Sequence, residues 1–317
     1  MAKYATMPLI DKILSLLDSA GTNSSVLEDR NTAHIVADGQ NLLSTQAIPG
    51  VTIDIKERPD ITIAGITIAG EARVANPIHF CFGMLQRIGT QNFRITIKLE
   101  PHAHASFLAH GLFSNVEFAR HIMDQYVEID EGANMRFTDS HFHGISGGIE
   151  VATTGKVKVG KQARYISDFS LTTGRVGKLD LKYSVQADDH AVVELTSRVF
   201  GHASDIIKIN EDVRLDGLFS RSLIKSRVAL EGEARAEIIG TTEGRAEGAR
   251  GHMDCMEIIK DQAVGQSTPS VKVSHPLAKI THEAAIGTVD KQQLETLIAH
   301  GLSPEQAVDA IVLGILR

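Results

Sequence analysis

The sequence predicts a parallel β-solenoid, a column of stacked two-strand coils, with a helical segment at each end. Three observations predict it. A turn-like motif recurs with a period of about 29 residues, and the segments between turns alternate between apolar and polar side chains. Large side chains are scarce, since the 317 residues include no Trp and only 5% aromatics, against 27 Gly. A thin core of Val, Ile, Leu and Ala explains that scarcity, so the length indicates one long column rather than two globular domains.

The recurring motif is an aliphatic or small residue, three polar or turn residues, and then Ala or a substitute that opens an alternating run. The motif ends at Ala103, Ala133, Ala163, Ala191, Phe219, Ala234 and Ala263, in steps of 30, 30, 28, 28, 15 and 29 residues. Because one step is half of the others, each repeat contains two strands, each followed by a turn. An antiparallel sandwich is the alternative, since it also has short alternating strands.

The segments between the turns are typical of half-buried strands. Residues 93–99, 178–185 and 234–238 alternate apolar and polar side chains with a period of two. The strand pattern begins near residue 30 and is plainest over residues 61–69. Each coil then buries its inner face only against its neighbours, and the ends of the column need covers.

Helices are expected outside this pattern. Apolar spacing predicts a helix over residues 8–17, and a second helical piece is expected over 116–123. The chain accordingly divides into an N-terminal helical segment (1–28), a solenoid (29–275) and a C-terminal helical domain (276–317).

The C-terminus carries the clearest helix signals. Asp290 and Gln293 fit a capping box, and Gly301 ends the first helix. Ser303 and Pro304 then fit the N-cap and first position of a second helix. The resulting hairpin is expected to cap the solenoid end, to dock a partner, or to do both.

Composition excludes several classes of function. With 32 Lys and Arg against 39 Asp and Glu, the net charge is −7, and no basic surface for nucleic acid is expected. The apolar run 310–316 is too short to cross a membrane, and the first residues lack a signal peptide, so a cytoplasmic protein is expected. No phosphate-binding loop or dinucleotide fingerprint is present, so nucleotide-driven work would belong to another subunit.

Histidines supply one candidate metal site. His141 and His143 share one face of a predicted strand, and His110 lies one coil earlier beside position 141. Imidazole suits several transition metals. The alternative interpretation is a polar ladder without a metal.

The two cysteines are interpreted differently. Cys81 lies between aromatic residues and is expected to be a small buried hydrophobe. Cys255 is flanked by Asp254 and Glu257, which would disfavour its thiolate, whereas a metal would favour it. Two cysteines cannot form a disulfide framework.

Several segments resemble one known family. They are similar to the SufB/SufD family of the SUF iron–sulfur cluster assembly system, in particular to its shorter archaeal-type members. The matching segments are Asp168–Leu171, Gly244–Cys255, Pro276–Ala285, Gly287–Gln293 and Gly301–Ala307, together with Ile311 and Val312. The resemblance extends over at least residues 125–317.

The resemblance implies a right-handed parallel β-helix with helical ends and a scaffold that is not itself an enzyme. It implies a partner ATPase of the SufC type, which would dock on the C-terminal helices. The candidate docking residues are Asp290, Gln293, Leu294, Gly301 and Leu302. It further implies pairing through the β-helix, with a second copy or a SufB/SufD paralogue, a transient iron–sulfur cluster, and acceptor proteins for that cluster.

The family's cluster-building residues carry over as Cys255, His282 and Glu283. His282 and Glu283 match its His-Glu-Ala motif directly. Cys255 falls one residue later than the family's Cys when counted back from Pro269 and Pro276. One residue of offset on a strand turns a side chain to the other face, unless a loop compensates.

Two other functions stay open. The chain could be a structural SufD-like partner without cluster ligands, which its two cysteines and the lack of a Cys-rich motif favour. The remote alternative is a solenoid enzyme such as a lyase or an acyltransferase. The sequence has neither the six-residue period of such acyltransferases nor the export signal of secreted lyases.

Overall fold

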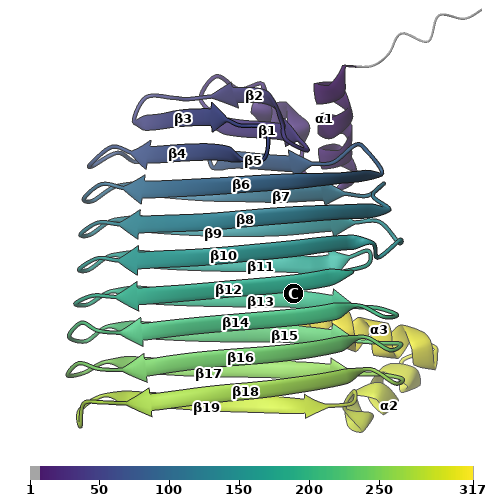
Figure 1. Cartoon of the computed structure of the whole chain (residues 1–317). Helices are drawn as coiled ribbons and strands as arrows, with labels where there is room; N and C mark the ends of the chain where they lie inside the picture. The colour runs from purple at the N-terminus through teal and green to yellow at the C-terminus, as the bar shows by residue number, and fades with distance from the viewer. Residues whose placement is uncertain (1–7, 317) are drawn as a thin grey trace, which may run out of the picture.

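The computed structural model describes residues 8–316, which form a flattened parallel β-solenoid with helices near both ends (Figure 1). Two sheets face each other, and the chain alternates between them from one strand to the next over most of the column. Neighbouring strands within each sheet are parallel, apart from the antiparallel pairs β1–β2 and β3–β4. The predicted solenoid is therefore confirmed, and the antiparallel sandwich is excluded.

Within residues 8–316, the sheet that we call sheet A has ten strands and sheet B has nine. Sheet A contains β1 (His34–Asp38), β2 (Asn41–Gln46), β5 (Ile78–Gly83), β7 (His104–Phe113), β9 (Asn134–His143), β11 (Arg164–Thr173), β13 (Val192–Gly201), β15 (Arg221–Leu230), β17 (Arg250–Ile259) and β19 (Lys279–Gly287). Sheet B contains β3 (Val51–Glu57), β4 (Thr62–Ile68), β6 (Ile88–Leu99), β8 (Phe118–Ile129), β10 (Ile149–Val159), β12 (Lys178–Ala187), β14 (Ile206–Leu215), β16 (Arg235–Gly244) and β18 (Val264–Val273).

The half-length step of the motif has a structural cause. Ala191 and Phe219 lie in turns that lead into strands of sheet A, whereas Ala234 and Ala263 lie in turns that lead into strands of sheet B. The motif therefore moves from one corner of the coil to the other between Phe219 and Ala234. A coil has two such corners, which is what the step of half a period predicts.

The core lies between the two sheets and changes in composition along the column. Inward positions alternate with outward ones on every central strand. In the later coils of sheet B, an inward row consists of Val157, Val185 and Val213. The first coils instead bury phenylalanines, including Phe80 and Phe107. Buried aromatic side chains continue to the middle of the column, where Tyr165, Phe169 and Tyr183 lie, and aliphatic side chains dominate the core after them.

One predicted helix exists and another does not. The predicted helix over 8–17 is confirmed as α1 (Leu9–Ser19), which a 3-10 turn (Ser24–Leu27) follows. The helix expected over 116–123 is wrong, because this segment enters β8, which pairs with β6 and β10. Among residues 8–316, no helix has the length and apolar character needed to cross a membrane.

The C-terminal hairpin comprises α2 (Lys291–Ala299) and α3 (Pro304–Ile315). Ser303 and Gln306 form a complete capping box at α3, while at α2 the Asp290 side chain accepts a hydrogen bond from the Gln293 backbone N–H at 2.8 Å. The helices begin later than residue 276, because β19 continues the solenoid to Gly287.

The hairpin covers the side of the column rather than its end. Ile311 and Val312 of α3 pack against Ala229 and Ile258, which lie on the outer face of sheet A. Strands β18 and β19 remain the outermost strands of their sheets. The expected role as an end cap is therefore corrected: the last coil is left open beside the hairpin (Figure 1).

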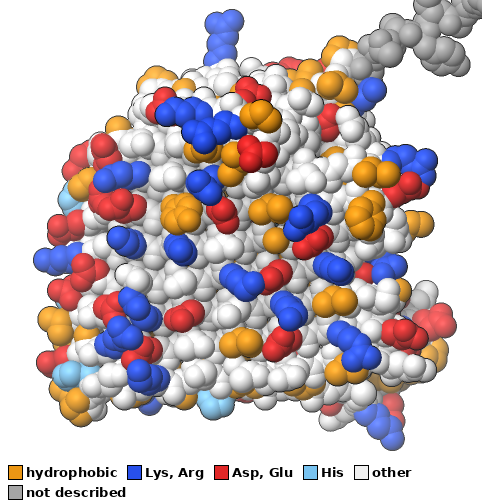
Figure 2. Space-filling view, viewed as in Figure 1, with side chains coloured by type: hydrophobic (Ala, Val, Ile, Leu, Met, Phe, Trp, Pro, Cys, Tyr) orange, Lys and Arg blue, Asp and Glu red, His pale blue; other side chains and the backbone are white. Residues whose placement is uncertain are grey.

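The outer surface carries charges of both signs. Figure 2 shows Lys and Arg side chains interspersed with Asp and Glu over the face in view. Ion pairs link neighbouring coils, as between Arg120 and Glu150, whose nitrogen and oxygen atoms are 3.1 Å apart. Pairs this exposed stabilise a fold by at most about 1 kcal/mol each.

Candidate functional site

Cys255 lies inside the solenoid, one coil before its open end. It occupies an inward position of β17, in register with Ser226 on β15 and Ala284 on β19. Only 3% of the residue is exposed. Its chain neighbours Asp254 and Met256 face outward. The thiol therefore faces the interior between the sheets.

The interior around Cys255 is polar. Glu211 reaches this region from β14 of the opposite sheet, and its carboxylate accepts hydrogen bonds from the hydroxyls of Ser197 at 2.6 Å and Ser226 at 3.5 Å. Glu257 lies two residues beyond Cys255 on the same face, and neither of its carboxylate oxygens has a hydrogen-bond partner within residues 8–316. A polar cluster thus replaces the apolar core where the column ends.

Burial is the main reason why the Cys255 thiol resists ionisation. It raises the pKa of Cys255, and the carboxylates of Glu211 and Glu257 raise it further, while the nearby hydroxyl of Ser226 acts in the opposite direction. The predicted effect of Glu257 is therefore confirmed. The predicted effect of Asp254 is wrong, because that side chain faces outward, where the Arg227 guanidinium lowers its pKa. A thiolate at Cys255 requires a cation such as a bound metal.

Glu211 is a functional candidate that the sequence analysis missed. Its burial raises the carboxyl pKa to about 7, despite hydrogen bonds from Ser197 and Ser226 that lower it. The available signal was the alternation in β14, where Glu211 follows the inward Ile207 and Ile209. A carboxyl that titrates near neutral pH can exchange a proton inside the core.

His282 and Glu283 are separated by the pleat of β19. His282 is in register with the inward Met253, and Glu283 with the outward Asp254. Because β19 is the last strand of its sheet, both side chains are exposed. The structure thus brings Cys255 and His282 to the same face of adjacent strands and places Glu283 on the other face. No three His, Cys, Asp or Glu side chains of residues 8–316 converge as a metal site.

The predicted site of His110, His141 and His143 is not assembled. His141 and His143 point into the solenoid, and their Nδ1 and Nε2 atoms are 3.4 Å apart. His110 is in register with Ser140, on the outward face, and contacts Thr22 instead. The sequence predicted the correct coil but combined side chains from opposite faces.

The inward histidines belong to a buried hydrogen-bond network. His141 Nε2 lies 3.3 Å from a carboxylate oxygen of Asp139, and His121 Nδ1 lies 2.7 Å from the side-chain oxygen of Gln91. Burial lowers the pKa of both His121 and His143 to about 3. These imidazoles are therefore neutral at physiological pH.

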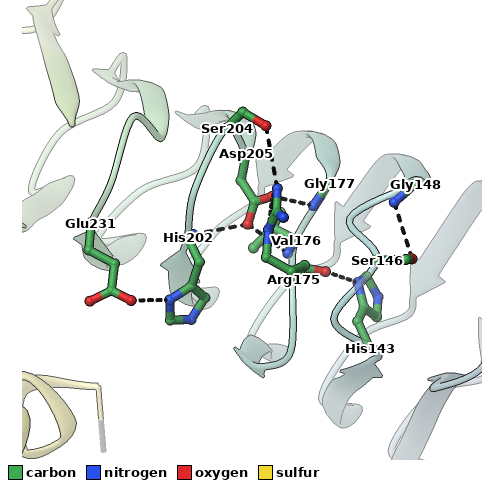
Figure 3. Close-up of polar contacts among 10 residues, drawn as sticks. All are labelled: His143, Ser146, Gly148, Arg175, Val176, Gly177, His202, Ser204, Asp205 and Glu231. Carbon is green, nitrogen blue, oxygen red and sulfur yellow. Dashed lines mark hydrogen bonds and ion pairs between the residues drawn. The ribbon is translucent and has the colours of Figure 1, made fainter. Parts of the chain in front are cut away.

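His143 also joins a row of contacts along one corner of the coils (Figure 3). Its Nδ1 atom lies 3.0 Å from the backbone oxygen of Arg175, whose guanidinium pairs with the fully buried Asp205. Asp205 also accepts hydrogen bonds from the backbone N–H groups of Val176, Gly177 and His202. This carboxylate fixes the corner between two coils.

The predicted docking residues lie around the C-terminal hairpin. Asp290 and Gln293 form the start of α2, Leu294 packs within the hairpin, and Gly301 has a left-handed φ of 98° that ends the first helix. Leu302 is half-buried in the connection. A pocket of about 330 Å³ opens between the hairpin and the carboxyl ends of two strands. It is lined in part by Ile258, Ile286, Asp290, Gln293, Ile311 and Ile315.

Comparison with known proteins gives a consistent result. Residues 84–315 match the family model for the SufBD core domain of SUF-system FeS cluster assembly. The chain is 36% identical over 282 residues to an iron–sulfur cluster assembly SufBD family protein of Methanocaldococcus jannaschii. These aligned residues make up 89% of each of the two chains. It is 31% identical over 306 residues to one of Pyrococcus horikoshii, covering 96% of this chain and 93% of the other. A shorter match, 32% over 74 residues, is to SufB of Bacillus subtilis, with 23% of this chain and 16% of the other covered.

Proposed function

The chain belongs to the SufBD family of the SUF system, and we propose that it is a cytoplasmic scaffold subunit on which an iron–sulfur cluster is assembled. Family membership supports the role in cluster assembly. One observation of the structure carries the finer proposal: Cys255 is a buried thiol in a polar interior, separated from solvent by a single open coil. Thiolate is the usual protein ligand of such clusters.

The open coil supports pairing with a second chain. Strands β18 and β19 have backbone edges that no strand within residues 8–316 covers, and such edges favour strand addition. Val271, Val273 and Ile286 are exposed there, each by more than 40%. We propose that a second copy or a SufB/SufD paralogue covers this end and encloses the assembly site.

Within that pair, Cys255 and His282 would act together. They lie on the same face of neighbouring strands, so a modest opening of the last coil exposes the thiol beside the imidazole. Glu283 faces the other way and would act from the outer side of the strand, toward the paired chain. Glu211 would receive the proton that Cys255 releases, through the Ser226 hydroxyl between them.

The hairpin of α2 and α3 would receive a SufC-type ATPase. The pocket described above lies between the hairpin and the ends of β17 and β19. A movement of the helices would therefore be transmitted to the last coil, next to Cys255. ATP hydrolysis by the partner could thereby open that coil. The chain itself would bind no nucleotide and would pass the finished cluster to acceptor proteins.

A structural SufD-like partner is the second candidate, and one observation favours it. Cys255, His282 and Glu283 do not converge in the single chain. In that case the chain would supply the paired surface and the ATPase contact only.

Anaerobic reconstitution separates the two candidates. The chain, co-expressed with its ATPase partner, is supplied with ferrous iron and sulfide, and cluster absorption is recorded. We expect Cys255→Ser to lose at least about nine-tenths of the absorption and His282→Ala to reduce it, because both remove a ligand. Cys81→Ser is the matched control, since it removes the other thiol without touching the site. No cluster absorption in wild type would instead support the structural role, and absorption that survives in Cys255→Ser would refute Cys255 as a ligand.

A further inference from the structure

A second group of metal-ligating side chains lies under α1, far from Cys255 along the column. It occupies the outward face of β5 and β7, which α1 covers (Figure 1). Cys81 is at its centre and is fully buried. Ile13 and Leu17 of α1 belong to the same buried cluster. The thiol is thus enclosed between a helix and the outer face of sheet A.

Strand register places imidazoles around this thiol. His110 on β7 is the direct register partner of Cys81 on β5. His79 precedes Cys81 by two residues and so shares its face, and His34 on β1 is the register partner of His79. The rings of His79 and His110 are stacked, with centroids 6.0 Å apart and planes within 8°.

All three of these imidazoles have an unsatisfied nitrogen. The Nδ1 atoms of His34, His79 and His110 are buried and have no hydrogen-bond partner within residues 8–316. His79 is 4% exposed and His110 is 6% exposed. An unpaired polar atom in the interior destabilises a fold by about 1–3 kcal/mol, so two beside one thiol call for an explanation.

We propose that Cys81, His79 and His110 bind a divalent first-row transition metal, such as Zn²⁺ or Co²⁺, beneath α1. One thiolate and two imidazoles are a donor set that these ions favour. The three donors are neighbours on two adjacent strands but do not converge in this structure. Binding therefore requires the two rings to turn from their stacked orientation toward the Cys81 sulfur.

The chemistry of binding is a simple exchange. The metal–sulfur bond forms as the Cys81 S–H bond breaks, and the proton goes to solvent. No electron is transferred. The metal would enter past the end of α1. The turn after this helix contains Gly21, which has a left-handed φ of 85°, and the next residue, Thr22, contacts His110 Nε2 at 3.2 Å. Three protein ligands leave a fourth position for water.

Cobalt titration of the full chain tests this site without iron or sulfide. Wild type is expected to bind one Co²⁺ and to show thiolate-to-cobalt charge-transfer absorption in the near ultraviolet. Cys81→Ser should abolish that band, and His110→Gln should weaken binding at least about tenfold. Cys255→Ser is the matched control and should keep the band. No band in wild type, or a band that depends on Cys255, would overturn the proposal.

A second measurement remains valid if a variant does not fold. Wild-type chain is treated with a thiol-alkylating reagent, with and without Zn²⁺, and each cysteine is followed by peptide mass spectrometry. Zn²⁺ should slow alkylation of Cys81 at least tenfold and leave that of Cys255 unchanged. Equal rates at Cys81 in both conditions would refute the site. Because neither assay uses sulfide or the ATPase, its result is independent of the proposed scaffold function.

Discussion

Replacing Asp205 with alanine should destabilise the solenoid at one corner. The side chain is fully buried, and its carboxylate accepts backbone N–H groups from Val176 at 2.9 Å, Gly177 at 3.0 Å and His202 at 2.9 Å. The Arg175 guanidinium lies 2.7 Å away and is itself only 21% exposed. Alanine removes the acceptor for all four groups at once (Figure 3).

The magnitude follows from those contacts. A buried donor that loses its acceptor destabilises a protein by about 1–3 kcal/mol, and breaking a buried charge pair by about 3–5 kcal/mol. These effects are not additive, and water can reach the partly exposed Arg175 and His202. We therefore expect a loss of about 4 kcal/mol in the free energy of unfolding, near the upper end for single substitutions.

Chemical denaturation at neutral pH, followed by circular dichroism, measures that loss. Asp180→Ala is the matched control, since Asp180 is an exposed partner of Lys182 on an outer face and should change stability by less than about 0.5 kcal/mol. A loss below about 1 kcal/mol for Asp205→Ala would contradict the argument that this carboxylate fixes the corner.

Two further predictions concern pH. The pKa of Glu211 is raised to about 7 from its ordinary value of 4.5, so between these two pH values the folded chain holds a proton that the unfolded chain has released. Stability should fall by about 2.5 kcal/mol between pH 5 and pH 8, and Glu211→Gln should remove that fall in denaturation curves. The pKa values of His121 and His143 are lowered to about 3 from 6.5, so the unfolded chain takes up protons first as the pH falls. Each should reduce stability by about 2 kcal/mol at pH 5 relative to pH 7.5, and a His121→Asn variant that loses as much stability on acidification as wild type would contradict this.

Local sequence signals predicted elements that depend on short-range chemistry. The Ser303 cap with Gln306 formed as expected, because a hydroxyl three residues before a backbone N–H can satisfy it without help from the rest of the chain. The segment after Val116 was misassigned as a helix. Its inward residues Ala119, His121 and Met123 fit strand β8 only because β6 and β10 lie on either side.

The candidate site, too, was predicted from the sequence only in part. Family motifs identified Cys255 and His282, and the structure places both on one side of their strands. The sequence analysis missed Glu211 because this residue approaches Cys255 from the opposite sheet and lies 44 positions before it in the sequence. The combination of His110 with His141 failed for a related reason: His110 is in register with Ser140, and the next residue, His141, faces the other side of its strand.

The sequence by itself determined the coil, its two corners and the scarcity of large side chains, because a period of two within strands and of about 29 between coils follows from local geometry and simple stacking. Only the tertiary structure decided which polar side chains meet. It placed the hairpin beside the column, left the last coil open, put Cys255 among carboxyls from two sheets, and covered Cys81 with α1. Those features depend on strand register and on how distant segments pack, and a register shift of one residue would have turned Cys255 and Cys81 to the other faces of their strands.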